Sequence, residues 1–259
     1  MGRLIRPPPP DTLSPMVRNA HGPPFAGVVF DCDSTLSTIE GIEELTAGHV
    51  EIAELTAAAM AGAVPLEEVY GRRLELAAPR VEDMERIGDR YAATALAGAA
   101  ELVAALRALG KRVAIVSGGL LPPVRAFGVG LGVLPEEIHA VDLRFDAAGA
   151  YAGFDEASPL ARAGGKREVL GSGFPDGDVA LVGDGATDLE ARDACARFIA
   201  FTAVARRPDV VEGADVEVSA PDLAALVPHL MTADEVARLR ALPGDPHAAL
   251  LERATEVSP

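Results

Sequence analysis

The hydrophobic positions of this chain form several short runs rich in valine, and three of these runs end in clusters of oxygen-bearing side chains. Short valine-rich runs predict buried parallel strands, here over residues 28–30, 113–116 and 179–182. The clusters that follow them are Asp-Cys-Asp-Ser-Thr at 31–35, Ser-Gly-Gly at 117–119 and Gly-Asp-Gly-Ala-Thr-Asp at 183–188. Because ligands of open α/β sheets bind beyond the carboxyl ends of the strands, we expect the clusters to meet in one acidic pocket.

The segment between the first two runs has a helical pattern instead. Apolar residues recur there at steps of three and four, with Gly62, Pro65 and Pro79 as interruptions. We therefore predict a helical bundle over residues 38–92, inserted after the first strand. The core domain then consists of residues 25–37 and 93–230.

From residue 98 onward, helical and strand patterns alternate, which predicts a parallel sheet with helices on both faces, an α/β fold of the Rossmann-like type. Residues 138–145 and 151–154, joined by Asp-Ala-Ala-Gly at 146–149, predict a small β-hairpin at the rim of the sheet. Amphipathic segments at 223–230, 233–242 and 248–254 predict helices, and residues 231–259 form a carboxy-terminal helical extension with no chemistry that we can assign. Residues 1–24 contain four consecutive prolines and are expected to be a disordered leader.

Composition narrows the possible partners. The 259-residue chain has a formal net charge of −16, which argues against nucleic acid, because binding to phosphate backbones needs clustered Lys and Arg. The absence of an apolar stretch of about 18 residues argues against a membrane span. Two distant cysteines, Cys32 and Cys195, suggest neither a disulfide framework nor a zinc site, and a cytoplasmic location is expected. We expect a monomer or a homodimer.

The acidic residues of the first and third clusters predict a metal site. If Asp31, Asp33, Asp184 and Asp188 converge, each carboxylate pair near 4 Å costs roughly 4 kcal/mol at an effective dielectric constant of about 20. A divalent cation would relieve that repulsion. All the available ligands are hard oxygens without His or Cys nearby, which favours Mg²⁺.

The same pocket has features that suit a phosphate. Ser117, Gly118 and Gly119 are expected to open a helix whose free amides attract an anion, and Lys166 follows two glycines and could add a positive charge. Transfer of a phosphoryl group to a carboxylate is then plausible. With Asp31 and Asp33 two residues apart, one could act as nucleophile and the other as proton carrier.

In order along the chain, residues 31–35, 117–119, Lys166 and 183–188 resemble the four motifs of the haloacid dehalogenase-like phosphatases. Within that superfamily the chain looks most like the phosphoserine phosphatases. The similarity covers residues 28–218 and takes in segments 40–45, 60–65, 73–74, 151–155 and 164–166.

The resemblance implies a role for each motif residue. Asp31 would be the aspartyl-phosphate nucleophile, and Asp33 the general acid and then the base toward water. The phosphoryl group and substrate would be held by Ser117, Gly118, Gly119, Lys166 and Thr187. Asp31, the backbone carbonyl of Asp33 and Asp184 would ligate Mg²⁺, with Asp188 supporting that site from close by.

The resemblance also implies a particular substrate and a mobile cap. Glu40 would meet the ammonium group of O-phosphoserine and Arg73 its carboxylate, for which the guanidinium fork is well shaped. The helical insertion would be a cap that closes over the site. The reaction expected is hydrolysis of O-phosphoserine to serine and phosphate, the last step of serine biosynthesis.

Several alternatives stay open at this point. The chain could transfer the phosphoryl group to another small alcohol such as homoserine, or act on a different small phosphomonoester, since Leu66 stands where relatives often carry an aromatic residue in the substrate pocket. A phospho-accepting signalling module also combines acidic residues, a hydroxyl and a lysine on a parallel sheet. Glu40 and Arg73 could form an ordinary exposed ion pair.

Overall fold

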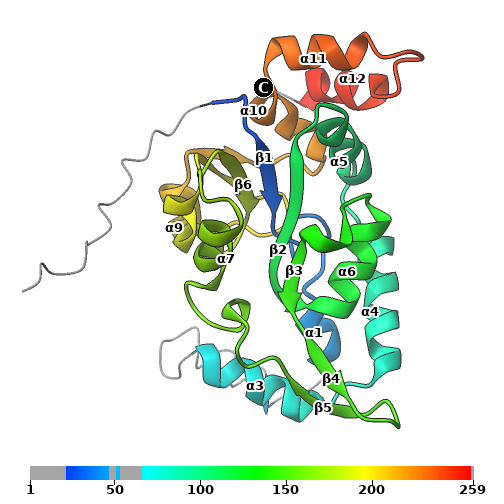
Figure 1. The fold of residues 1–259 in the computed structure, drawn as a ribbon, viewed down its shortest axis with the longest axis vertical. Helices are drawn as coiled ribbons and strands as arrows, with labels where there is room; N and C mark the ends of the chain where they lie inside the picture. Colours follow the sequence, from blue (N-terminus) through cyan, green and yellow to red (C-terminus); the bar gives the residue numbers. More distant parts are fainter. Residues whose placement is uncertain (1–21, 47–50, 53–65, 258–259) are drawn as a thin grey trace, which may run out of the picture.

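In the computed structural model, which describes residues 22–46, 51–52 and 66–257, six parallel strands form the central sheet (Figure 1). Their order across the sheet is β3-β2-β1-β6-β7-β8. The strands are β1 (Gly27–Phe30), β2 (Arg112–Leu120), β3 (Ile138–Val141), β6 (Val179–Gly183), β7 (Arg197–Phe201) and β8 (Val216–Val218). The expected α/β fold with a parallel sheet is confirmed.

The three strands that carry the polar clusters are neighbours in this sheet. Phe30, the last residue of β1, pairs with Ile115 of β2 on one side and with Val182 of β6 on the other. The amide of Asp31 then donates to the Val182 carbonyl oxygen at 2.9 Å. β1 is buried along its whole length, as its valines require. The clusters after these strands therefore meet at one edge of the sheet.

Helices pack along the sheet, with α7 and α9 to one side of β1 and α5 and α6 to the other in Figure 1. These and the short α8 have the bounds α5 (Ala99–Ala108), α6 (Leu121–Gly130), α7 (Gly165–Gly173), α8 (Ala186–Glu190) and α9 (Pro208–Gly213). Short 3₁₀ turns at η1 (Pro135–Glu137), η2 (Pro159–Ala161) and η3 (Arg192–Ala194) join some of them.

The helix predicted to begin at the second cluster, residues 117–119, begins later than expected. β2 continues through Ser117, Gly118 and Gly119, and α6 begins only at Leu121, so these three residues do not open a helix. Pro122 and Pro123 account for this start, because proline in the first helical turn has the right φ and lacks an N–H that would have no partner there. The serine and glycines lie on the strand's irregular last stretch instead.

The predicted hairpin is also partly wrong. Residues 138–145 do not form one hairpin strand: β3 pairs with β2 in the parallel sheet, and only β4 (Leu143–Phe145) pairs with β5 (Tyr151–Phe154) in an antiparallel ribbon. The reason is burial, since Ile138 and Val141 pack into the core against β2 while the chain beyond Asp142 leaves the sheet. This ribbon, the flap, extends beside α3 (Figure 1).

The described parts of the predicted insertion are helical, as expected. They comprise α1 (Gly41–Thr46), α3 (Leu66–Ala77) and α4 (Val81–Ala93). α4 packs against α6 of the core, where the ring of Tyr91 stacks on that of Phe127 with centroids 5.5 Å apart. The predicted domain boundaries at 38 and 92 stay a prediction. The side chain of Leu66 and most of the leader lie outside the described residues.

The three helical segments predicted near the carboxyl terminus are present as η4 (Leu223–Leu226), α10 (Val227–Leu230), α11 (Ala233–Arg240) and α12 (Ala248–Val257). Lys111 ties α11 to the core: its Nζ lies 2.6 Å from Glu235 Oε1 and donates to the Phe25 carbonyl oxygen at 2.9 Å. α11 and α12 lie at the end of the molecule opposite α3 (Figure 1). Across the described ranges, the helices are too short or too polar to cross a membrane.

Candidate active site

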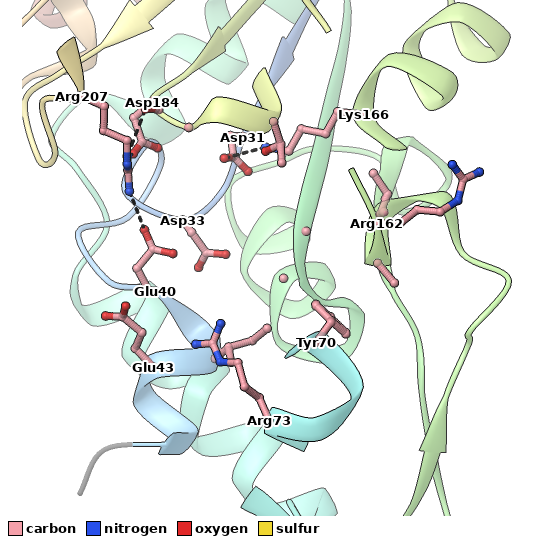
Figure 2. Close-up of a pocket in the computed structure, with 17 residues that line it drawn as sticks. Asp31, Asp33, Glu40, Glu43, Tyr70, Arg73, Arg162, Lys166, Asp184 and Arg207 are labelled. Carbon is pink, nitrogen blue, oxygen red and sulfur yellow. Dashed lines mark hydrogen bonds and ion pairs between the residues drawn. The ribbon is translucent and has the colours of Figure 1, made fainter. Parts of the chain in front are cut away.

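A pocket of about 220 Å³ opens where the strand-end clusters meet (Figure 2). Its wall includes most of the side chains and glycines that the sequence singled out: Asp31, Asp33, Glu40, Arg73, Gly118, Gly119, Lys166, Asp184 and Thr187. Two predicted residues, Ser117 and Asp188, are fully buried and lie behind this wall. The structure thus brings residues from both the core and the insertion to one cavity.

Lys166 lies between two carboxylates at the base of the pocket. Its Nζ is 2.7 Å from Asp31 Oδ2 and 2.7 Å from Asp188 Oδ1, and only 4% of the lysine side chain is exposed. Burial alone would lower the pKa of Lys166, but Asp188 and Asp31 outweigh it and raise the pKa above its ordinary value. The lysine is therefore a fixed positive charge beside Asp31.

Asp188 is packed tightly against the end of β6. A Cβ added at Gly183 would lie 2.3 Å from Asp188 Cγ, so only glycine fits there. The amide of Gly185 donates to Asp188 Oδ2 at 3.0 Å. Burial and the Asp31 carboxylate raise the pKa of Asp188 above its ordinary value.

Three of the buried carboxylates form a candidate metal site. Asp31, Asp184 and Asp188 each offer an oxygen within 4.8 Å of the others. Hard, anionic oxygens in a cluster of this size suit a divalent cation such as Mg²⁺. Two further groups steady Asp184: Thr35 Oγ1 donates to its Oδ1 at 3.1 Å, and Arg207 donates to its Oδ2 and, at 3.0 Å, to its backbone oxygen. The residues present fit a metal ion.

Asp33 has different surroundings from Asp31. Its Oδ1 accepts hydrogen bonds from the Tyr91 hydroxyl and, at 2.9 Å, from the Gly41 amide. Its Oδ2 faces Gly119, where an added Cβ would lie 2.9 Å away. Burial, with Glu40 and Asp31 nearby, raises the pKa of Asp33 to about 7. A carboxyl with such a pKa can both donate and accept a proton near neutral pH.

Ser117 lies behind the pocket wall, and its role in binding a phosphoryl group stays a prediction. Its Oγ accepts a hydrogen bond from the Gly119 amide at 3.0 Å, and its side chain has no exposed surface. Gly118 and Gly119 stand on the pocket wall in its place. A phosphoryl group in the pocket would first meet these glycines.

Glu40 and Arg73 come from the insertion and face the same cavity (Figure 2). Glu40 Oε1 accepts a hydrogen bond from Ser34 Oγ at 2.7 Å and lies 3.9 Å from Arg207 Nη2. Arg73, on α3, forms no ion pair with Glu40, and its Nε is buried without a partner in the described part of the chain. The two are therefore not an ordinary surface pair, and a ligand between them could contact both.

The structure also adds residues that the sequence reasoning missed: Glu43, Tyr70, Tyr91, Arg162 and Arg207. Arg207 follows β7, whose apolar run Phe-Ile-Ala-Phe could have been recognised as a fourth strand ending at the same edge. Tyr70 precedes Arg73 by three residues and so shares its helix face. Nothing in the sequence signalled Tyr91, which meets Asp33 across 58 positions.

A parallel sheet with a buried aspartate cluster and a lysine at its carboxyl edge is the arrangement that the resemblance to haloacid dehalogenase-like phosphatases implies. Residues 28–192 match the family model described as haloacid dehalogenase-like hydrolase, which is more than half of the chain, and the chain belongs to this family.

More particular similarity is to phosphoserine phosphatases. The chloroplastic phosphoserine phosphatase of Arabidopsis thaliana is 39% identical over 197 residues, which cover 73% of this chain and 66% of that protein. The Homo sapiens phosphoserine phosphatase is 35% identical over 193 residues, or 72% of this chain and 86% of that one. A solved structure of a phospho-aspartyl intermediate analogue of phosphoserine phosphatase has a TM-score of 0.65 and 27% identity, and the match covers 79% of this chain and 98% of that chain.

Proposed function

We propose that this protein is a Mg²⁺-dependent phosphatase that hydrolyses O-phosphoserine to serine and phosphate. The observation that carries the proposal is the arrangement of Asp31 and Asp33 on one pocket wall. Asp31 lies beside the fixed charge of Lys166, while Asp33 is held separately by Tyr91 and Gly41. This difference supports nucleophilic attack by Asp31 and proton transfer by Asp33.

In the first half of the reaction, an Asp31 oxygen attacks the phosphorus atom and forms an aspartyl phosphate. The bond from phosphorus to the serine oxygen breaks, and the leaving oxygen takes a proton from Asp33. In the second half, Asp33 accepts a proton from a water molecule whose oxygen attacks phosphorus. Phosphate leaves and the Asp31 carboxylate is regenerated, so atoms and protons balance over the cycle.

The remaining groups bind and orient the substrate. Lys166, Thr187 and the backbone of Gly118 would hold the phosphoryl oxygens. Gly119, whose amide donates to Ser117 Oγ, would line the pocket beside them. Asp31, the carbonyl of Asp33 and Asp184 would hold Mg²⁺, with Asp188 beside them. When bound, the ion offsets negative charge on the phosphoryl group.

Substrate choice depends on the insertion. Glu40 would bind the ammonium group of phosphoserine and Arg73 its carboxylate, since both line the pocket and neither is committed to the other. We also propose that residues 38–92 act as a cap over a core of residues 25–37 and 93–230, and that the enzyme works in the cytoplasm on a small phosphomonoester.

A phosphate-release screen tests reaction and substrate together. We would compare phosphoserine, phosphothreonine, sugar phosphates and nucleotides with and without Mg²⁺. The proposal expects phosphoserine to give the highest kcat/KM and chelation by EDTA to stop release. Preference for another substrate, a phosphorylated acceptor alcohol among the products, or a phospho-Asp31 lifetime of minutes would overturn it.

A further inference from the structure

Tyr70 lines the pocket and has a buried hydroxyl with no partner in the part of the chain that the structure describes. The residue lies on α3, only 7% of its surface is exposed, and its hydroxyl oxygen makes no hydrogen bond among the described residues. Buried polar groups in proteins are nearly always paired, so an unpaired one in a cavity wall indicates where a ligand can bind. None of the roles assigned so far uses this hydroxyl.

Tyr70 packs against the flap. Its ring contacts that of Phe154, with centroids 5.4 Å apart. Arg73 stands one helical turn further on, and its Nε is likewise buried without a hydrogen-bond partner in the described ranges. Figure 2 shows both side chains on the α3 side of the pocket. Two hydrogen-bond donors from one helix face thus line the same wall.

The charged groups around the pocket indicate which part of the substrate the α3 wall would bind. Glu40, just before α1, and Glu43, on α1, line the pocket and suit an ammonium group, and Lys166 stands with Asp31 where the phosphoryl group would react. The α3 wall offers a guanidinium and a hydroxyl. Burial, followed by the nearby Asp33 charge, raises the pKa of the Tyr70 hydroxyl above its ordinary value, so the group stays protonated and can donate.

We propose that the Tyr70 hydroxyl donates a hydrogen bond to the carboxylate of the substrate, beside Arg73, and that Tyr70 is therefore a specificity-determining residue. A carboxylate has two oxygens and can accept from the guanidinium and the hydroxyl at once. The inference rests on the proposed phosphoserine phosphatase activity. It adds that the amino-acid end of the substrate is recognised by two side chains of α3.

The test is the substrate preference of Tyr70→Phe, which removes the hydroxyl and keeps the ring against Phe154. Phosphoserine is compared with phosphoethanolamine, which has the same ester and ammonium group but no carboxylate. We expect the ratio of the two kcat/KM values to fall about tenfold, through KM for phosphoserine, as loss of a hydrogen bond to a charged group implies. Tyr151→Phe is the matched control, because this flap tyrosine lies outside the pocket wall, and its ratio should not change.

Other outcomes distinguish a failure of the Tyr70 assignment from a failure of the proposed function. If wild-type protein turns over phosphoserine and the ratio is unchanged in Tyr70→Phe, the inference fails while the proposed function stands. An equal loss on both substrates would place the hydroxyl on the phosphoryl or ammonium end and also overturn it. If wild-type protein releases phosphate from phosphoethanolamine but not from phosphoserine, the proposed function itself fails. A thermal unfolding curve like that of wild type shows that the variant is folded.

Discussion

The hydroxyl of Tyr91, on α4, donates a hydrogen bond to Oδ1 of Asp33, in the turn after β1. Tyr91 is fully buried, and its ring is held by Phe127 of α6. The Gly41 amide donates to the same oxygen at 2.9 Å. The two donors orient the Asp33 carboxyl so that its other oxygen faces Gly119 and the pocket.

Tyr91→Phe should impair proton transfer to the leaving group more than attack by Asp31. In rapid-quench experiments, we expect the rate of phosphoenzyme formation from phosphoserine to fall about tenfold, a part of the usual contribution of a general acid. With an aryl phosphate, whose leaving group needs no proton, the loss should stay within about threefold. Equal losses with both substrates would show that Tyr91 does not act through Asp33.

Asp31→Asn should abolish turnover, because an amide cannot form the covalent intermediate. We expect kcat to fall at least about a thousandfold, the scale of losing a nucleophile. Asp176→Asn, at an exposed position, is the control and should retain activity. Phosphate release and circular dichroism together check the result. A folded Asp31→Asn protein that still hydrolyses phosphoserine would exclude Asp31 as nucleophile.

Arg73→Ala should weaken binding of the substrate's carboxylate. Hydrogen bonds to charged groups are worth roughly 1.5–3 kcal/mol, so KM for phosphoserine should rise about ten- to a hundredfold. KM for an aryl phosphate should change much less. Arg72→Ala is the matched control, since the neighbouring Arg72 is exposed and pairs with Glu75 on the outside of α3. A similar rise for both substrates would contradict the assignment of Arg73.

The ion pair between Lys111 and Glu235 should stabilise the fold without affecting catalysis. Glu235→Gln leaves the 4% exposed Lys111 side chain without its counter-charge, and we expect a loss of about 1–3 kcal/mol in the free energy of unfolding. Asp234→Asn, exposed in the same helical turn, is the control. Denaturant unfolding measures both. An unchanged stability in Glu235→Gln would show that the pair contributes nothing.

The same pair should give a defined pH dependence. Burial acts to raise the pKa of Glu235, but the hydrogen bonds from Lys111 and Thr232 outweigh it and lower the pKa. A lowered folded-state pKa means that the stabilisation is complete above the unfolded value, about 4.3, and is lost as the pH falls through the folded value. The stability difference between wild type and Glu235→Gln should therefore be full at pH 7 and shrink below about pH 4.

Secondary structure could be predicted from the sequence where it depends on residues that are adjacent in the chain. The valine runs gave β1 and β6 almost to the residue, because a strand buried on both faces needs an apolar side chain at every position. The predicted strands were wrong where pairing with a strand distant in the sequence determines the structure. Ile138 joins the parallel sheet and Phe145 the flap, although one continuous apolar pattern includes both.

By itself, the sequence determined the parallel sheet and the aspartates, glycines and lysine near the ends of its strands. This was possible because the apolar runs and the polar residues that follow them can be recognised in the sequence. Only the tertiary structure decided how these groups are paired: Lys166 between Asp31 and Asp188, Arg207 on Asp184, and Tyr91 on Asp33. The physical reason is that a side chain's partners and burial depend on residues brought together by packing, and these determine which carboxylate keeps its charge and which holds a proton.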